Sequence, residues 1–163
     1  MLEADLVIGR DGERSLSRNA LIGRPDPPKH SGDIVFRTAV PISRQCGREE
    51  LQELLDPPSV HFWLGPNAHA LSYTLKEAGL LNVVLVCPDY SDSQVSLGPQ
   101  AADIAEVKKV VEDWYPRFKT LLGPAPGATK WILVKCNDVS SWTHPEGRFA
   151  LLGSSAHAML PYM

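Results

Sequence analysis

Runs of apolar residues, some of them alternating with polar ones, predict short strands along most of the chain. The predicted strands cover residues 4–8, 33–40, 59–64, 68–75, 80–87, 131–135 and 149–152. Only Gly65-Pro66-Asn67 and residues 76–79 separate the three runs between 59 and 87. Connections this short and this rich in turn residues favour antiparallel neighbours. We therefore expect a largely antiparallel sheet in the middle of the sequence.

Apolar residues at three- and four-residue steps predict helices between these strands. The clearest case is the segment 101–115, where one stripe consists of Ile104, Val107, Val110, Val111 and Trp114. Such a stripe is typical of a helix that packs on a core. Shorter helices are expected over 13–21 and 49–55, and a short turn over 118–122. The segments 22–31 and 89–100 carry Gly, Pro, Ser and Asp and are predicted to be loops.

The first predicted strand runs into the turn Gly9-Arg10-Asp11-Gly12. Two glycines let the backbone approach a ligand closely, and the Asp11 carboxylate accepts hydrogen bonds from ligand hydroxyls or main-chain N–H groups. Arg14 and Arg18 follow four residues apart, on one helix face. Two arginines in this arrangement suit either of two roles, a clamp for a pyrophosphate or ion pairs with nearby acids. The alternative is an ordinary strand–turn–helix with solvated arginines.

The C-terminal segment has a similar arrangement. Residues 149–152 predict a buried strand, Gly153 allows a tight turn, and Ser154 is a favourable N-cap. A strand that enters a helix N-terminus through glycine brings free N–H groups together, which is typical of an anion or cofactor site. Pro161 ends the helix early. A serine hydrolase is not supported, because the second glycine of G-x-S-x-G is missing.

Composition narrows the classes of function. The chain has 163 residues, of which 44% are hydrophobic and 21% charged, with a net charge of −3. This charge argues against a nucleic-acid partner, and no apolar run approaches the length of a membrane span. Cys46, Cys87 and Cys136 are scattered, which favours reduced thiols and a cytoplasmic location over a disulfide framework. None of the five histidines has metal-ligand spacing, so no metal site is expected.

Both ends of the chain resemble FAD-dependent aromatic hydroxylases of the salicylate and para-hydroxybenzoate hydroxylase type. A-D-L-V-I-G-R-D-G-E-R-S-L-S-R is similar to the family's middle motif, in which an Asp-Gly pair contacts FAD and the nicotinamide cofactor. G-R-F-A-L-L-G-S-S-A-H-A-M-L-P is similar to its second flavin motif, in which a Gly-Asp pair holds the ribityl chain. The resemblance implies that a group of residues lies along FAD, namely Asp11, Gly12, Arg18, Gly153 and Ser154. It places Pro161 near the flavin ring.

The middle of the chain resembles the substrate domain of the same family. The similarity includes F-W-L-G-P, a tyrosine at Tyr73 and the apolar run up to Cys87. The resemblance implies that Arg37 and Tyr73 position the substrate. From the strand pattern alone, Arg37 is equally well an edge or outward-facing residue. His69 and Tyr73 share one face of a strand, where a lone His or Tyr is more often a structural residue than a substrate contact.

Together these observations predict an α+β fold with a mixed, largely antiparallel sheet and partial flavin-binding elements at both ends. We expect one domain over 1–163, with flavin-binding elements at 1–23 and 147–163 and the substrate sheet at 30–136. The resemblance implies a monooxygenase that hydroxylates a small phenolic substrate with FAD, NAD(P)H and O2, with Arg37, Tyr73 and Pro161 at the reacting centre.

The chain has no G-x-G-x-x-G turn, and the resemblance covers only the central portion of the family's sequence. We therefore expect a truncated form of the enzyme. Two alternatives stay open: a non-catalytic remnant that binds a small aromatic or a partner chain, and half of a split enzyme completed by a second chain with the Rossmann unit. Ser154 stands where the family has Asp, and the loss of a charge-assisted hydrogen bond predicts FAD affinity about ten- to a hundredfold lower.

Overall fold

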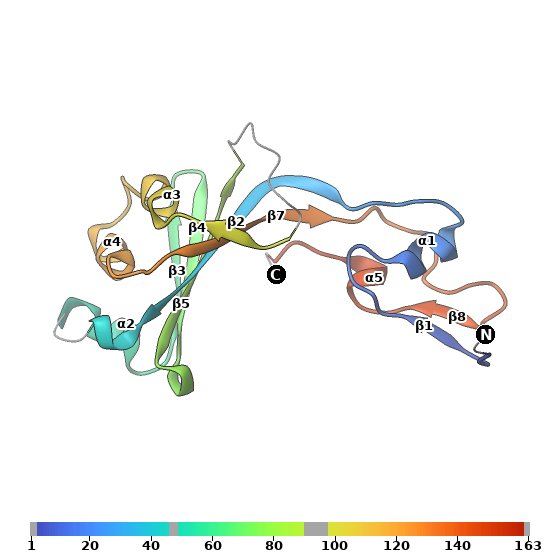
Figure 1. Ribbon diagram of the computed structural model, residues 1–163, viewed down its shortest axis with the longest axis horizontal. Coiled ribbons are helices and arrows are strands. Elements are labelled where there is room, and N and C mark those ends of the chain that lie inside the picture. The colour runs from blue at the N-terminus through green and yellow to red at the C-terminus, as the bar shows by residue number, and fades with distance from the viewer. Residues whose placement is uncertain (1–2, 46–48, 90–97, 162–163) are drawn as a thin grey trace. The chain divides into compact units, whose positions relative to one another are not determined.

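A computed structural model describes residues 3–45, 49–89 and 98–161 of the chain (Figure 1). The chain folds as two compact units. One unit combines both ends of the sequence, residues 1–31 and 133–163, and is called the terminal unit. The other spans residues 32–132 and is called the central unit. The expectation of one domain over 1–163 stays a prediction, and the two units are described separately.

A six-stranded sheet dominates the central unit, with the strand order β3-β4-β5-β2-β7-β6. The strands are β2 (Lys29–Pro41), β3 (Val60–Gly65), β4 (Ala68–Leu75), β5 (Leu80–Pro88), β6 (Gln100–Ala102) and β7 (Ala128–Lys135). The pairs β3–β4, β4–β5, β2–β5 and β6–β7 are antiparallel. The fold is therefore the predicted α+β class with a largely antiparallel sheet, and the short turns between residues 59 and 87 do join neighbouring strands.

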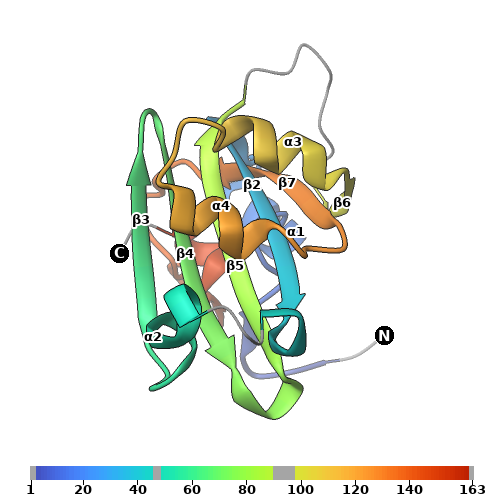
Figure 2. The same ribbon diagram turned by 90° about the vertical axis from the view of Figure 1, so that its left-hand side faces the viewer.

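Helices cover one face of this sheet (Figure 2). They are α3 (Ile104–Val110) and α4 (Pro116–Leu122), and the short helix α2 (Gln52–Leu55) follows the 3₁₀ turn η2 (Glu49–Leu51). Two further 3₁₀ turns are η1 (Ile42–Gln45) and η3 (Lys76–Ala78).

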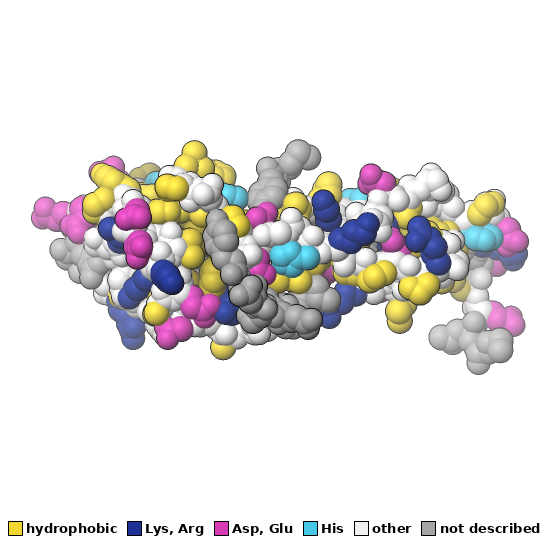
Figure 3. Space-filling model, turned by 90° about the horizontal axis from the view of Figure 1, so that it is seen from above, with side chains coloured by type: hydrophobic (Ala, Val, Ile, Leu, Met, Phe, Trp, Pro, Cys, Tyr) yellow, Lys and Arg dark blue, Asp and Glu magenta, His cyan; other side chains and the backbone are white. Residues whose placement is uncertain are grey.

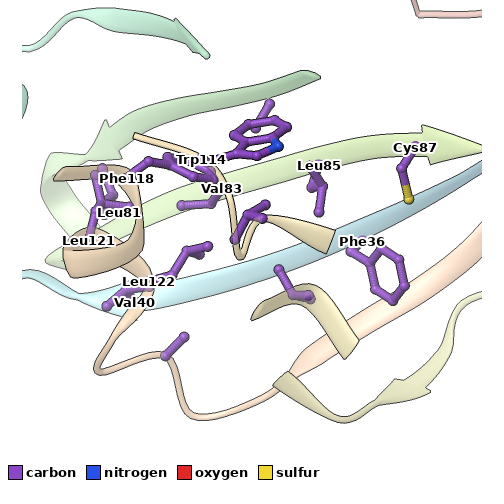
Figure 4. Packing of buried hydrophobic residues seen from close by; sticks show 14 of the residues in the cluster. Phe36, Val40, Leu81, Val83, Leu85, Cys87, Trp114, Phe118, Leu121 and Leu122 are labelled. Atoms are coloured by element: carbon purple, nitrogen blue, oxygen red, sulfur yellow. The ribbon is translucent and has the colours of Figure 1, made fainter. Parts of the chain in front are cut away.

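The core of the central unit lies between the sheet and these helices (Figure 4). Every second residue of β2 and β5 points into it, so that Phe36, Val40, Leu81, Val83 and Leu85 are buried. They pack against Trp114, Phe118, Leu121 and Leu122 of the helical segment. Each such side chain stabilises the fold by roughly 1.5–3 kcal/mol relative to its exposed state.

The single helix predicted over 101–115 is wrong in its bounds. Residues 100–102 pair with β7 as strand β6, and α3 begins only at Ile104. Asp103 sets this start, because its carboxylate accepts the Ala105 N–H at 2.9 Å while Glu106 accepts the Asp103 N–H at 3.2 Å. The apolar stripe still faces the core, since Val107, Val111 and Trp114 are buried.

A second helix replaces the short turn predicted over 118–122. Helix α4 begins with Pro116, whose fixed φ and missing N–H suit the first helical position. The chain therefore ends α3 at Val110, passes through residues 111–115 and starts α4 at Pro116.

Two parallel strands form the sheet of the terminal unit, β1 (Val7–Gly9) and β8 (Phe149–Leu151). Helix α1 (Leu16–Ile22) follows β1, and α5 (Ser154–His157) follows β8. The buried strand predicted over 4–8 is wrong in its burial, because Leu6, Val7 and Ile8 are each about half exposed. Within the described chain β1 pairs only with β8, so its side chains have little to pack against.

The loop predicted over 22–31 is shorter than expected, because strand β2 already starts at Lys29.

Apolar side chains reach the surface in both units (Figure 3). Across residues 3–45, 49–89 and 98–161, no helix combines the length and the hydropathy that a membrane span requires.

Candidate functional site

The turn after β1 holds an ionised, exposed carboxylate. Asp11 accepts the Ser15 hydroxyl at 2.5 Å through Oδ1 and the Ser17 N–H at 3.0 Å through Oδ2. These hydrogen bonds, that from Ser15 first, lower the pKa of Asp11 from 3.8 to about 2. Gly12 follows with φ at 81°, a conformation that glycine adopts without strain. The turn therefore presents a fixed negative charge with lone pairs still open to solvent.

Ser15 connects this turn to helix α1. Its Oγ accepts the Arg18 N–H at 2.8 Å and so caps the helix N-terminus. The hydroxyl thus donates to Asp11 and accepts from Arg18 at the same time. Ser15, which lies between Asp11 and Arg18 in the same motif, therefore holds the Asp11 carboxylate against the N-terminus of α1.

Arg18 is 1% exposed, and internal partners surround its guanidinium. Nε donates to Asp26 Oδ2 at 2.8 Å, and the terminal nitrogens donate to the carbonyl oxygens of Ala156 and Asn137. The sequence offered two roles for this arginine, a pyrophosphate clamp or an ion pair with a nearby acid, and the structure shows an ion pair. A direct contact between Arg18 and FAD stays a prediction.

Asp26 and Asn137 complete this buried network, and the sequence analysis missed both. Burial raises the pKa of Asp26, but the hydrogen bond from Asn137 Nδ2 and the contact with Arg18 lower it further, so that it lies below its ordinary value. Asp26 sits in a Pro-rich segment and Asn137 follows β7, more than 100 positions away. No local pattern relates them, and only the fold brings them together.

The turn after β8 differs from the expectation at Ser154. Gly153, with φ at 63°, is the N-cap of α5, and Ser154 is its first helical residue and is exposed. The predicted N-cap role of Ser154 is therefore wrong, and no side chain caps this short helix. The buried serine is Ser155, whose Oγ lies 2.8 Å from the Gly9 carbonyl oxygen and 2.7 Å from that of Leu152.

These contacts bring the two predicted flavin-binding turns into one unit. Ser155 joins the end of β1 to the start of α5, and Arg18 joins α1 to the carbonyl of Ala156. Among the described residues of the terminal unit, no heavy atom beyond the local chain lies within 4 Å of the Cβ position at Gly12 or Gly153, so this unit leaves the backbone open to a ligand at both turns. Pro161 is exposed, beyond the last helix.

The face of the central sheet that lies away from the helices carries the predicted substrate residues. Tyr73 stands opposite Asn82, and Arg37 stands opposite Val84, which places both on this face. Arg37 Nε donates to Asn82 Oδ1 at 2.7 Å. His69 shares the same face as Tyr73, opposite Val86. We refer to this surface, defined by Arg37, Tyr73 and Asn82, as the open face.

Asn82 is the residue of the open face that sequence reasoning did not find. It is 0% exposed, and its Nδ2 has no hydrogen-bond partner among the residues that the structure describes. The sequence did contain a sign of this residue, because an asparagine within the apolar run 80–87 needs a hydrogen-bond partner once it is buried. Its amide oxygen fixes the direction of the Arg37 guanidinium, and its amide nitrogen is an unused donor.

Exposed apolar side chains of the edge strand β3 lie beside Tyr73 on the same face. Val60, Phe62 and Leu64 of β3 stand opposite Tyr73, Leu71 and His69, and they are 56%, 74% and 86% exposed. An apolar surface with an arginine and a tyrosine suits a flat ring that bears a carboxylate or hydroxyl group.

Comparisons with known proteins point to one class of enzyme. No family model matches the sequence. The chain is 33% identical over 165 residues to the FAD-dependent monooxygenase OpS4 of Beauveria bassiana, covering 99% of this chain and 38% of that relative. It is 36% identical over 163 residues to the 3-amino-4-hydroxybenzoate 2-monooxygenase PtnB3 of Streptomyces platensis, again covering 99% and 38%.

Solved structures give the same result for the fold. The structure of a salicylate hydroxylase substrate complex matches with a TM-score of 0.79 at 28% identity, covering 97% of this chain and 41% of that one. The structure of CtdE with FAD and substrate 4 matches with a TM-score of 0.81 at 23% identity, over 98% and 40%.

The α+β fold with its six-stranded, largely antiparallel sheet is thus shared with solved structures of flavin monooxygenases. Over nearly its whole length, the chain is homologous to a segment of the FAD-dependent aromatic monooxygenases. It spans about 38% of the length of the curated relatives named above.

Proposed function

We propose that this chain provides the substrate sheet and part of the FAD site of a monooxygenase that hydroxylates a small phenolic substrate. The observation that carries the proposal is the convergence of the Asp11 and Gly153 turns in one unit of a chain homologous to such enzymes. In the proposed reaction NAD(P)H is the reductant, one atom of O2 enters the ring and the other leaves as water. FAD, when bound, supplies this oxygen-transfer chemistry.

Four of the predicted positions in the terminal unit support the proposal of an FAD site. The Asp11 carboxylate is ionised and exposed, and the open backbone at Gly12 and Gly153 lets a ligand approach closely. Ser154 presents its hydroxyl at the adjacent first turn of α5. Arg18 acts as a positioning residue in this proposal, because its buried guanidinium connects α1 to Asp26 and to the Ala156 carbonyl of α5. We place Pro161 near the flavin ring by resemblance alone.

On the open face, we propose that Arg37 and Tyr73 position the aromatic substrate. The Arg37 guanidinium pairs with a ring carboxylate or phenolate, and the Tyr73 hydroxyl contacts a second ring substituent. Asn82 holds Arg37 in place through the 2.7 Å hydrogen bond. The exposed apolar residues of β3 cover the ring and exclude water from it.

An FAD titration of the purified chain, followed by flavin fluorescence, tests the cofactor part of the proposal. We expect weak, saturable binding, and binding about ten- to a hundredfold tighter in Ser154→Asp, because a carboxylate accepts ribityl hydroxyls more strongly. Ser140→Asp adds the same charge at another exposed serine of the terminal unit and is the control. Absence of saturable binding in both the native chain and Ser154→Asp would contradict FAD binding by this chain alone.

A salicylate titration tests the substrate part independently of FAD. We expect Arg37→Gln to weaken salicylate binding about tenfold, because it removes the charge that faces the ring carboxylate. Arg44→Gln, at an exposed arginine outside the open face, is expected to leave the affinity unchanged. Equal affinity in both variants would remove Arg37 from the substrate site.

A second candidate function rests on the exposed apolar surface of β1. Leu6 and the β1 residues Val7 and Ile8 are each about half exposed, and the described chain pairs β1 on one side only. This favours a split enzyme in which a second chain with the Rossmann unit covers β1, or a remnant that binds a small aromatic without catalysis. Mixing the chain with a polypeptide that contains the G-x-G-x-x-G unit of a relative separates these two: tighter FAD binding supports the split enzyme, and unchanged binding supports the remnant.

A further inference from the structure

A pocket lies in the central unit, on the face of the sheet that carries the helices. Its volume is about 510 Å³, within the range of small-molecule sites in proteins. Its floor consists of the side chains of Ile34, Phe36, Ala68 and Cys87. We call it the helix-side pocket.

The sheet separates the helix-side pocket from the open face. Ile34 and Phe36 alternate along β2 with Val35 and Arg37, so the two sets of side chains point to opposite faces. Cys87 likewise lies on the core side of β5, whereas Asn82 lies on the other. A ligand in this pocket therefore does not compete with a substrate beside Arg37.

The floor of the pocket is apolar and chemically inert. Ile34, Phe36 and Cys87 are 5%, 6% and 4% exposed. Burial, followed by the nearby charges of Asp33 and Asp89, raises the pKa of the Cys87 thiol to about 11. The thiol is therefore protonated at neutral pH and behaves as a small apolar group, which favours a ring or an alkyl chain as its neighbour.

Charged side chains form the rim. Glu106 and Lys130 neutralise each other through a 2.5 Å contact, and Glu106 also accepts the Asp103 N–H. The Asp89 carboxylate lies at the end of β5. Lys109, from α3, forms no ion pair within the described part of the chain. It is therefore the cation that is available to a ligand.

From this combination we propose that the helix-side pocket binds an apolar carboxylate with a fused-ring body. The ring system lies on Ile34, Phe36 and Cys87, and its carboxylate pairs with Lys109 at the rim. A volume of about 510 Å³ suits a ligand larger than the single aromatic ring expected on the open face. The site is additional to the proposed function and does not depend on it.

Binding of 2-naphthoate to the whole chain, measured by calorimetry and by methyl chemical shifts, tests this site. We expect saturable binding that shifts the methyl signals of Ala68 and Val110, which line the pocket, and leaves those of Leu64 and Leu71 on the opposite face unchanged. Saturable binding that shifts Leu64 and Leu71 instead would assign the ligand to the open face. Either that result or the absence of saturable binding would overturn the proposal.

Two charge reversals on one helix provide a matched comparison. Lys109→Glu is expected to weaken 2-naphthoate binding about five- to tenfold, because it replaces the attractive charge by a repulsive one at a solvent-exposed rim. Lys108→Glu makes the same change at the neighbouring exposed residue, which does not line the pocket, and is expected to have no effect. Neutral 2-naphthol should not distinguish the two variants. Equal weakening of 2-naphthoate binding by both reversals would contradict the role of Lys109.

Discussion

At the scale of single residues, the terminal unit depends on one buried arginine. Arg18 is 1% exposed and bonds to Asp26 and to main-chain oxygens from the other end of the sequence. The sequence indicated that Arg18 belongs to a functional motif, and it offered an acidic partner as one role. It did not identify the partner, because Asp26 and Asn137 are related only through the fold. In the same way the pattern around Gly153 suggested that Ser154 caps the helix. In the structure Gly153 takes the N-cap position, and Ser154 is the first helical residue.

The variant Arg18→Gln should lower the free energy of unfolding by about 3–5 kcal/mol, since it leaves the Asp26 carboxylate buried without its countercharge. Urea unfolding followed by circular dichroism measures this loss. Arg14→Gln, at an exposed arginine four residues earlier, should change the free energy by less than about 0.5 kcal/mol. Similar losses in the two variants would show that the buried network does not stabilise the fold.

The carboxylate of Asp11 predicts a dependence of stability on acid. Its pKa in the folded chain, about 2, lies below the ordinary value of 3.8. The hydrogen bonds from Ser15 and Ser17 therefore contribute fully above pH 3.8 and are lost as the pH falls from 3.8 towards 2. In Asp11→Asn, the urea midpoint should fall less steeply across this window than in the native chain. Glu13→Gln, at an exposed neighbouring acid, should leave the steepness unchanged.

At the scale of elements, the middle of the chain was the most predictable. Strands β4 and β5 follow their apolar runs closely, because both are central and each residue's burial is set by the pairing on both sides. The region after residue 100 was less predictable, because its apolar stripe continues across a capping box and a proline that divide it into α3 and α4. Strand β1 was recognised as a strand, but its burial depends on neighbours that its own sequence does not contain.

The packing of β3 against the helical segment gives a test at this scale. A Cβ at Gly65 would lie 2.1 Å from Cε2 of Trp114, whose indole is buried in the core. Gly65→Ala should therefore lower the free energy of unfolding by about 1–3 kcal/mol through overpacking. Gly127→Ala adds the same methyl group where no described atom beyond the adjacent residues lies within 4 Å, and it should be close to neutral. Both values come from urea unfolding, and an equal effect of the two would mean that Trp114 moves aside freely.

At the scale of the whole molecule, the surface of β1 is expected to govern self-association. Ile8 is 55% exposed on a strand whose outer edge is unpaired in the described chain. Ile8→Lys should reduce aggregation, measured by light scattering at increasing protein concentration, with little change in the free energy of unfolding. Leu16→Lys adds the same charge at a leucine that is 76% exposed outside the sheet. Equal suppression by both variants would indicate a general effect of charge and not an effect of β1.

The pairing of the two sequence ends in the terminal unit also has a consequence for biosynthesis. Arg18 leaves the ribosome 138 residues before its partner Ala156, and the central unit is completed in the interval. At typical rates of translation this interval lasts on the order of 10 s. During this interval Arg18 and the rest of the first 31 residues lack their partners from residues 133–163, while the central sheet folds. Nascent chains halted before residue 156 should accordingly be protected from proteases in the central unit but cut readily within their first 31 residues.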